Sequence, residues 1–304
     1  MKHLNLILAS LILSLAVISC KKDKTEITET KPEKDSLIAN QTPEIHKEMY
    51  GVYYGYFSPD YSINDGEYDE EDMVKKISFK INKITKDSVY GQSVLNGNQR
   101  LFRGIMNEST NSFILDEPGD DKTDGRFDVK IKGDSLVGIW TAFDQTAVRI
   151  KKKGLKLVKK EFVYNPNFML DKDTDVVDWT SHKMKKMSFG KDEDGNDQGT
   201  YETDQQRYAT NAIFTINASK QKLTEKDLKN LPKLDMEIIK NAIFARHGYS
   251  FKKETFRQFF NQSDWYVPVS NNVDAELTPL EKENAALLNR FIKYAEDHYD
   301  TFGR

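Results

Sequence analysis

Apolar and polar residues alternate in a series of short runs between residues 50 and 164, and turn signals separate each run from the next. Ile77, Phe79 and Ile81, for example, occupy every second position, with serine and lysine between them. A period of two puts successive side chains on opposite faces of a strand, so each run has one buried and one solvated face. The runs cover residues 50–57, 74–84, 88–95, 100–106, 112–115, 126–131, 135–143, 147–152 and 155–164. Consecutive strands of this kind predict an antiparallel meander that closes into a barrel.

Glycine stands inside several of these runs, where it often marks a bulge or the sharp bend that a small barrel needs at its corners. The order of the pieces, with Tyr53-Tyr54-Gly55-Tyr56 in the first run and Gly138-Ile139-Trp140 in a late one, resembles lipocalin-like or calycin-like lipoprotein domains in layout. Such a barrel encloses a small ligand or is filled by its own side chains. Because no polar residues converge at the expected inward positions, we expect a filled barrel or a modest pocket at its mouth.

The alternation dissolves between residues 166 and 206, where acidic residues gather. Asp192, Asp194 and Asn196 alternate as the ligands of a calcium-binding loop do. Such a loop also needs glycine at its sixth position and glutamate at its twelfth, where this protein has Asp197 and Thr203. We therefore interpret the run as a solvated loop and expect no metal site. Residues 176–187 either form a strand or lie across the barrel, and residues 208–216 have the pattern of a strand.

Helical periodicity replaces the alternation from Leu223 onward. Thr224 and Asp227 have the spacing of an N-cap with an acid in the first turn, and Pro232 follows the short helix that they begin. Thr278-Pro279-Leu280-Glu281 is a capping box with proline at the first helical position. The predicted helices cover residues 224–231, 234–247, 253–261 and 278–298. A barrel followed by a small helical domain makes the predicted fold α+β.

The second of these helices ends in Asn241-Ala242-Ile243-Phe244-Ala245-Arg246-His247-Gly248, and Trp265-Tyr266 follows an aromatic-rich helix. Leu-Thr pairs stand at residues 223–224 and 277–278. Together these features resemble the YARHG domain, over a span from Leu223 to about Glu296. Phe244 stands where the motif of that family has tyrosine. The resemblance implies an extracytoplasmic module of bacterial lipoproteins and membrane proteins. Because no activity is established for that module, the resemblance implies a location and no reaction.

Two interpretations of the motif are open. In the structural one, Gly248 provides a left-handed C-cap, the cations bond the last carbonyls of the helix, and Phe244 touches Tyr249 across the turn. Arg246 then pairs with Asp235, Asp264 or Glu281. In the functional one, Arg246, His247 and Trp265 form a polar pocket that captures an anionic or glycan ligand by forked hydrogen bonds and stacking. The residues concerned are Asn241, Phe244, Arg246, His247, Gly248, Trp265 and Tyr266.

Cys20 is the only cysteine among the 304 residues. It follows one basic residue, Lys2, and a run of mostly apolar or small residues from Leu4 to Ile18, which is the pattern of a secretory signal and is too short to span a bilayer. Val17-Ile18-Ser19-Cys20 resembles a bacterial lipobox, which implies cleavage before Cys20, a diacylglycerol on its thiol and an acyl group on the new amino terminus. Several acyl chains would anchor the protein in the outer membrane, on its periplasmic face or at the cell surface. The alternative is a free thiol behind a signal that is cut elsewhere.

Catalytic motifs are missing from the sequence. Without residues 1–19 the chain has 44 basic and 48 acidic residues, a net charge of −4, so no partner nucleic acid is expected. The histidines are isolated, and no nucleophile, P-loop or dinucleotide motif occurs. We expect a non-catalytic envelope lipoprotein, without a cofactor beyond the lipid on Cys20, that binds a protein, a glycan or peptidoglycan. The alternatives are a small-ligand carrier that uses the barrel interior and an envelope hydrolase with a site near His247.

Almost every residue from Lys21 to Thr42 is polar, charged or proline, a composition that cannot bury enough apolar surface to order itself. The protein is thus expected to divide into a signal peptide (1–19), a lipidated flexible tether (20–45), a barrel domain (46–165), an acidic connecting segment (166–206) and a strand with the helical YARHG domain (207–304).

Overall fold

The computed structural model describes residues 42–60, 75–300 and 302. The predicted signal peptide, Cys20 and nearly all of the predicted tether lie outside these residues. Within the described part of the protein, no helix combines the length and the apolar character that a bilayer crossing requires.

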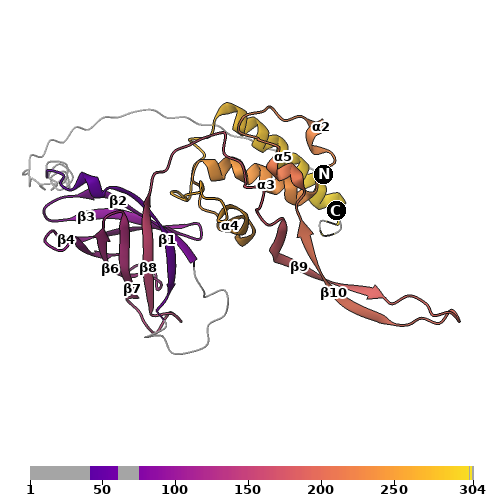
Figure 1. Cartoon of the computed structure of the whole chain (residues 1–304), viewed down its shortest axis with the longest axis horizontal. Coiled ribbons are helices and arrows are strands. Elements are labelled where there is room, and N and C mark those ends of the chain that lie inside the picture. Colours follow the sequence, from indigo (N-terminus) through magenta and orange to yellow (C-terminus); the bar gives the residue numbers. More distant parts are fainter. Residues whose placement is uncertain (1–41, 61–74, 301, 303–304) are drawn as a thin grey trace, which may run out of the picture. The chain divides into compact units, whose positions relative to one another are not determined.

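Eight antiparallel strands close into a barrel (Figure 1). Each strand pairs with its neighbours in the sequence, and β1 completes the ring by pairing with β8, with Tyr54 opposite Val158. The predicted meander and its closure are therefore confirmed. Closure pairs the two outermost strands with each other and so removes the sheet edges that favour aggregation. The strands are β1 (Gly51–Pro59), β2 (Lys75–Ile84), β3 (Val89–Leu95), β4 (Asn98–Asn107), β5 (Ser112–Asp116), β6 (Gly125–Lys132), β7 (Ser135–Ala142) and β8 (Lys152–Lys160).

Aromatic side chains from three strands fill the middle of the barrel. Phe79 of β2 stacks on Phe102 of β4 with 4.4 Å between the ring centroids, and Phe127 of β6 meets Phe79 edge-on at 5.2 Å. All three rings are buried, whereas the alternate residues Lys80 and Arg126 are exposed. Burying a ring of this kind stabilises a fold by about 1.5–3 kcal/mol. The two-residue period of the sequence thus corresponds to the inner and outer faces of the barrel.

Strands β4 and β5 approach each other closely at Gly104. A β-carbon at this position would lie 1.8 Å from the carbonyl oxygen of Ile114, which is far closer than β-carbons come to other atoms in proteins. Gly154 in β8 is the opposite case, because no heavy atom lies within 4 Å of its β-carbon position. The spacing of β4 and β5 therefore requires glycine at position 104, and the surroundings of position 154 do not.

The alternation predicts strands at residues 147–152 and 155–164, whereas the structure has one strand, β8, from Lys152 to Lys160. Asp144 makes the difference, because its carboxylate accepts hydrogen bonds from the N–H groups of Thr146 at 2.9 Å and Ala147 at 3.2 Å. These bonds fold the backbone into a turn before β8 begins. The predicted strand at 147–152 is wrong because local hydrogen bonding by a side chain outweighs apolar alternation.

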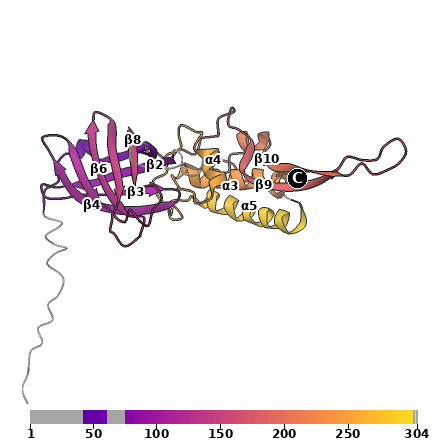
Figure 2. The same ribbon diagram turned by 90° about the horizontal axis from the view of Figure 1, so that it is seen from below.

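The part of the protein that follows the barrel contains the helices α2 (Glu225–Leu228), α3 (Lys233–Arg246), α4 (Glu254–Phe260) and α5 (Pro279–His298), and Figure 2 shows α3, α4 and α5. Thr224 N–H donates to the Asp227 carboxylate at 2.8 Å at the start of α2. At the start of α5, Thr278 N–H donates to Glu281 at 2.9 Å, and Glu281 N–H donates back to the Thr278 hydroxyl at 3.2 Å. Both predicted caps are confirmed. A short 3-10 helix, η1 (Lys47–Met49), precedes the barrel.

Two long strands, β9 (Val177–Ser188) and β10 (Thr200–Tyr208), form a separate antiparallel ribbon. The predicted strand at 176–187 is confirmed, and the one at 208–216 is wrong, because β10 ends at Tyr208 and the 3-10 helix η3 (Asn211–Phe214) follows. Thr210 turns the backbone at this point. Its hydroxyl accepts from Ala212 N–H at 3.2 Å, and its own N–H donates to Asp235 of α3 at 2.8 Å. The predicted connecting segment thus contains β9 and most of β10.

A buried ion pair ties the base of the ribbon to α3. Arg207 donates to Asp178 of β9 at 2.6 Å and to Glu237 of α3 at 2.8 Å. Burial opposes the ionisation of Asp178, but hydrogen bonds from Thr180 and Arg207 outweigh it and lower the pKa of this carboxyl. Because an unpaired buried charge is costly, the three groups hold ribbon and helix together as a unit.

We expect Gly104→Ala to destabilise the barrel by about 1–3 kcal/mol, the usual cost of overpacking, because the new methyl group would overlap the backbone of β5. Gly154→Ala is the matched control and should leave the stability nearly unchanged. Urea unfolding followed by tryptophan fluorescence measures both. Equal losses in the two variants would contradict the close contact at Gly104.

Candidate functional site

The Ala245-Arg246-His247-Gly248 segment forms the end of α3. Gly248 has a φ angle of 74°, in the left-handed region that glycine adopts without strain. Tyr249 N–H donates to the Phe244 carbonyl at 3.0 Å, and Gly248 N–H donates to the Ala245 carbonyl at 2.9 Å. These bonds satisfy carbonyls that the helix leaves without partners. The Phe244 and Tyr249 rings also meet edge-on, with centroids 6.0 Å apart.

Arg246 lies inside the protein, with 2% of its surface exposed. Its Nε donates to the carbonyl of Phe168 at 2.7 Å and its Nη1 to the hydroxyl of Ser219 at 3.1 Å, while Nη2 faces the sulfur of Met169 at 3.4 Å. The predicted direct pairing with Asp235, Asp264 or Glu281 is wrong, because these neutral groups take the hydrogen bonds. Burial lowers the pKa of Arg246 to about 10, and the negative charge of Glu281 limits the fall, so the side chain stays charged at neutral pH.

His247 is buried against the first turn of α5. Its Nε2 lies 2.9 Å from the Glu281 carboxylate, and the Tyr164 ring stacks on the imidazole with 4.2 Å between the centroids. Tyr164 also donates its hydroxyl proton to Glu281 at 3.2 Å. Burial and the nearby Glu281 charge raise the pKa of Tyr164 to about 12, so its hydroxyl remains a donor. The imidazole therefore contacts a helix cap and a tyrosine instead of open solvent.

Glu281 joins these groups into one network. Burial opposes its ionisation, but hydrogen bonds from Ser219, Thr278 and His247 outweigh it and lower the pKa of the carboxyl. Ser219 also accepts from Arg246, so one hydroxyl links the guanidinium to the carboxylate. The end of α3 and the start of α5 are thereby fixed to each other.

Trp265 contacts the same segment of backbone as Arg246. Its Nε1 donates to the carbonyl of Met169 at 2.8 Å, and its ring stacks on Phe168 with 5.4 Å between the centroids. The structure thus brings Arg246, His247 and Trp265 around residues 164–170, which cover them, and the open polar pocket of the functional interpretation does not form.

The other motif residues have partners within the helical domain. Tyr266 is buried and donates to the Tyr249 carbonyl at 2.7 Å; burial holds its pKa well above the usual value. Asn241 donates to the Glu237 carbonyl, one turn earlier in α3, at 2.7 Å. Phe244 packs between two apolar clusters. None of these three contacts points to a ligand.

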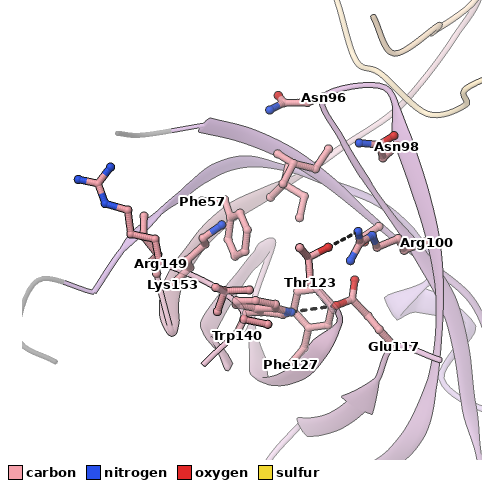
Figure 3. Close-up of a pocket in the computed structure, with 16 residues that line it drawn as sticks. Phe57, Asn96, Asn98, Arg100, Glu117, Thr123, Phe127, Trp140, Arg149 and Lys153 are labelled. Atoms are coloured by element: carbon pink, nitrogen blue, oxygen red, sulfur yellow. Dashed lines mark hydrogen bonds between the residues drawn. The ribbon is translucent and has the colours of Figure 1, made fainter. Parts of the chain in front are cut away.

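A cavity of about 410 Å³ opens at one mouth of the barrel (Figure 3). Its apolar wall consists of Phe57, Phe127 and Trp140, whose rings come from three strands. Among the residues that the structure describes, the charged ones that line it are the cations Arg100, Arg149 and Lys153 and the acid Glu117. This size and mixture are typical of sites that bind small molecules or single groups of a larger partner.

The polar groups of the cavity are held by hydrogen bonds. Glu117 is 6% exposed and accepts from Trp140 Nε1 at 3.0 Å and from Gly125 N–H at 2.8 Å. Arg100 donates to the buried Asp124 at 2.6 Å. It also donates to the Thr123 hydroxyl at 2.5 Å (Figure 3). Burial raises the pKa of Glu117, and the hydrogen bonds from Trp140 and Gly125 limit the rise. The acid and the arginine therefore hold fixed positions before any ligand arrives.

Lys153 lies over two rings of the cavity wall. Its Nζ is 5.0 Å from the centroid of Phe57 and 5.4 Å from that of Trp140, distances at which a cation is attracted to an aromatic face. Arg149 is exposed on the segment before β8. Arg100, Arg149 and Lys153 thus bring positive charge to the lining of the cavity.

The expected pocket at the barrel mouth is present, but polar residues converge there, contrary to the premise of that prediction. Glu117 and Asp124 stand on the β5–β6 connection, which the sequence marks as a turn, and Arg100 lies at the start of β4. One local signal was present, because acids at both ends of a glycine-containing turn suggest hydrogen bonding across it. The hydrogen bond between Glu117 and Trp140 of β7 could not be predicted from the sequence, because the two residues are far apart along it.

Residues 207–292 match the family model of the YARHG domain. The match begins at Arg207 of the buried ion pair and extends to Ile292 of α5, so it includes the whole Arg246-His247-Glu281 network. No curated protein and no solved structure matches this protein. Within the described residues, no group of three or more histidine, cysteine, aspartate or glutamate side chains is arranged to hold a metal ion.

We expect Glu281→Gln to reduce the free energy of unfolding by about 2–3 kcal/mol at neutral pH, because the charged acceptor of a buried network is lost. The folded-state pKa of Glu281 lies below its ordinary value of 4.5, so ionised Glu281 stabilises the fold above that pH. The difference in the free energy of unfolding between the wild type and the variant should shrink as the pH falls further. Chemical denaturation from pH 3 to pH 8 measures this difference.

Glu283→Gln is the matched control, because Glu283 lies on the same helix but is 58% exposed beside Lys222. Its effect should be small at every pH, as for other surface pairs. A Glu281 variant that behaves like the Glu283 variant would contradict the role of the network.

Proposed function

We propose that this protein is a non-catalytic, lipid-anchored lipoprotein of the bacterial cell envelope that holds an anionic group of an envelope partner in the mouth of its barrel. The observation that carries the proposal is the cavity lined by Trp140, Glu117 and Lys153, where rings and charged groups face one space. The YARHG match supports the envelope location. The lipobox-like sequence that ends at Cys20 supports the anchor.

The geometry of His247 disfavours an envelope hydrolase at this residue. A general base has to reach a proton of the substrate or of a water molecule. His247 is 6% exposed, its Nε2 lies against Glu281, and Tyr164 covers one face of its ring. A substrate would have to displace this packing before any proton transfer.

The cavity favours a ligand with an anionic group on a small ring or apolar body. Among the described residues, Arg100, Arg149 and Lys153 are the cations of the cavity lining, and Phe57, Phe127 and Trp140 supply apolar contact. Carboxylate-bearing fragments of peptidoglycan have this chemistry, and a volume of about 410 Å³ suits such a fragment or a free small molecule. The small-ligand carrier is the second candidate function, and this volume is what favours it.

We expect Cys20→Ala to abolish acylation and to release the protein from the membrane fraction, because the thiol is the site of lipid attachment in a lipobox. Labelling of growing cells with an alkyne-tagged fatty acid, followed by membrane fractionation, measures both. A variant that still incorporates the label, or a wild type that never does, would contradict the lipid anchor.

We expect the protein without residues 1–20 to bind soluble peptidoglycan fragments saturably in calorimetric titrations. Lys153→Met should weaken binding about tenfold, since a hydrogen bond to a charged group contributes about 1.5–3 kcal/mol. Lys156→Met is the matched control, because Lys156 is exposed on the same strand and does not line the cavity. Rising salt should weaken the wild type more than the Lys153 variant.

A small anionic molecule that binds with the same dependence on Lys153, when the fragments do not, would favour the carrier. Absence of any saturable ligand, or equal losses in the Lys153 and Lys156 variants, would contradict the cavity as the binding site.

A further inference from the structure

Glu117 is a buried acid of the barrel mouth, and only one oxygen of its carboxylate is occupied. The side chain lines the cavity, although only 6% of the residue is exposed. Trp140 Nε1 and Gly125 N–H both donate to the same oxygen, Oε2, at 3.0 Å and 2.8 Å. Among the described residues, none donates a hydrogen bond to Oε1. Figure 3 shows this second oxygen turned away from the Trp140 indole, so one acceptor of the carboxylate remains available in the cavity.

The negative charge of Glu117 also lacks an ion pair. The charge of Arg100 acts on Glu117, but the guanidinium donates to Asp124 at 2.6 Å and lies 3.7 Å from Asp121. Within the part of the chain that the structure describes, no cation forms a salt bridge with Glu117. Buried charges are normally paired, because an unpaired one is costly. Burial raises the pKa of Glu117, as it does for an acid whose charge is incompletely offset.

The wall around Glu117 favours a cationic donor over a neutral one. The rings of Trp140 and Phe127 line the same cavity, and aromatic faces attract cations. An ammonium group on a carboxylate forms a charge-assisted hydrogen bond, which is about twice as strong as a neutral one. A hydroxyl or amide N–H would occupy Oε1 but would leave the charge in place. The group that suits this position best is therefore a primary ammonium.

Trp140 contacts both the acid and a cation of the cavity. Its N–H bonds to Glu117, while the Nζ of Lys153 lies 5.4 Å from the centroid of its ring. Arg149 lines the cavity as well. Groups of both charges thus border the cavity within the span of one indole. A compact ligand that carries both charges is complementary to this wall.

We propose that Glu117 binds a primary ammonium group, and that the ligand of the barrel mouth is a zwitterion of the amino-acid type. Its ammonium donates to Oε1 of Glu117, and its carboxylate faces the cationic part of the lining. The ammonium site rests on the proposed function, which supplies the anionic group and leaves the rest of the ligand open. Peptide ends with a free amine have this chemistry, whereas acidic glycans without an amine do not.

The experiment compares two forms of one probe. Soluble peptidoglycan fragments with free amino groups are titrated calorimetrically into the protein without residues 1–20. The same fragments are titrated after acetylation of their amines, which keeps the carboxylates. The wild type should bind the acetylated form about tenfold more weakly, because the charge-assisted bond to Glu117 is lost.

Glu117→Gln keeps an oxygen for the Trp140 and Gly125 donors and removes the charge. This variant should bind both forms of the probe alike, with about the affinity of the wild type for the acetylated form. Asp116→Asn is the matched control, because the neighbouring Asp116 has a side chain that is 41% exposed beside Arg126 and does not line the cavity. The control should keep the preference of about tenfold for the free amine.

The melting temperature shows whether Glu117→Gln is folded. If it is not, the indole N–H signal of Trp140 in NMR spectra of the wild type, assigned with Trp140→Phe, takes the place of the variant. Because this N–H bonds to Glu117, its signal should shift when the amino form is added and much less when the acetylated form is added.

The ammonium site and the proposed function fail in different ways. If neither form of the probe binds saturably, the proposed function is contradicted, and the ammonium site with it. Equal binding of the two forms by the wild type, a preference that survives Glu117→Gln, or a preference lost in Asp116→Asn would overturn the ammonium site alone. In those cases the cavity still binds the anionic group of the ligand.

Discussion

The helical domain depends on the burial of a charged arginine at the end of α3. Arg246 keeps its charge at neutral pH, and a charge in the interior has to be offset by acceptors at short range. The Phe168 carbonyl and the Ser219 hydroxyl meet this need, and Ser219 passes the interaction on to Glu281. Because Glu281 also caps α5, one buried cation links residues 164–170, the end of α3 and the start of α5.

The barrel contains a related arrangement with the opposite charge. Glu117 is buried near the mouth and is held by an indole N–H and a backbone N–H from different parts of the β6–β7 hairpin. The rings of Phe127 and Trp140 and the cations Arg100, Arg149 and Lys153 line the same cavity. An acid held by hydrogen bonds, aromatic rings and cations therefore face one space at this mouth of the barrel.

The accuracy of the sequence-based predictions followed the range of the interactions involved. Thr224 and Thr278 were recognised as helix caps because their partners stand three residues away, and the barrel was recognised because a two-residue period is repeated strand after strand. The strand at 208–216 was predicted wrongly, because Thr210 bonds to Asp235, which is distant in the sequence. Arg246 was matched to acids for the same reason: its true acceptors, the Phe168 carbonyl and Ser219, could not be identified from sequence spacing.

The sequence by itself determined the parts that local patterns encode: an antiparallel barrel, the capped helices, a left-handed glycine at the end of α3 and the likeness to the YARHG domain. Only the tertiary structure decided which groups meet. It placed residues 164–170 over Arg246, His247 and Trp265, and it gathered Glu117, Trp140 and Lys153 at one barrel mouth. The physical reason is that caps and periodicity act within a few residues, whereas a buried charge takes whichever acceptor the packed protein brings within hydrogen-bonding distance.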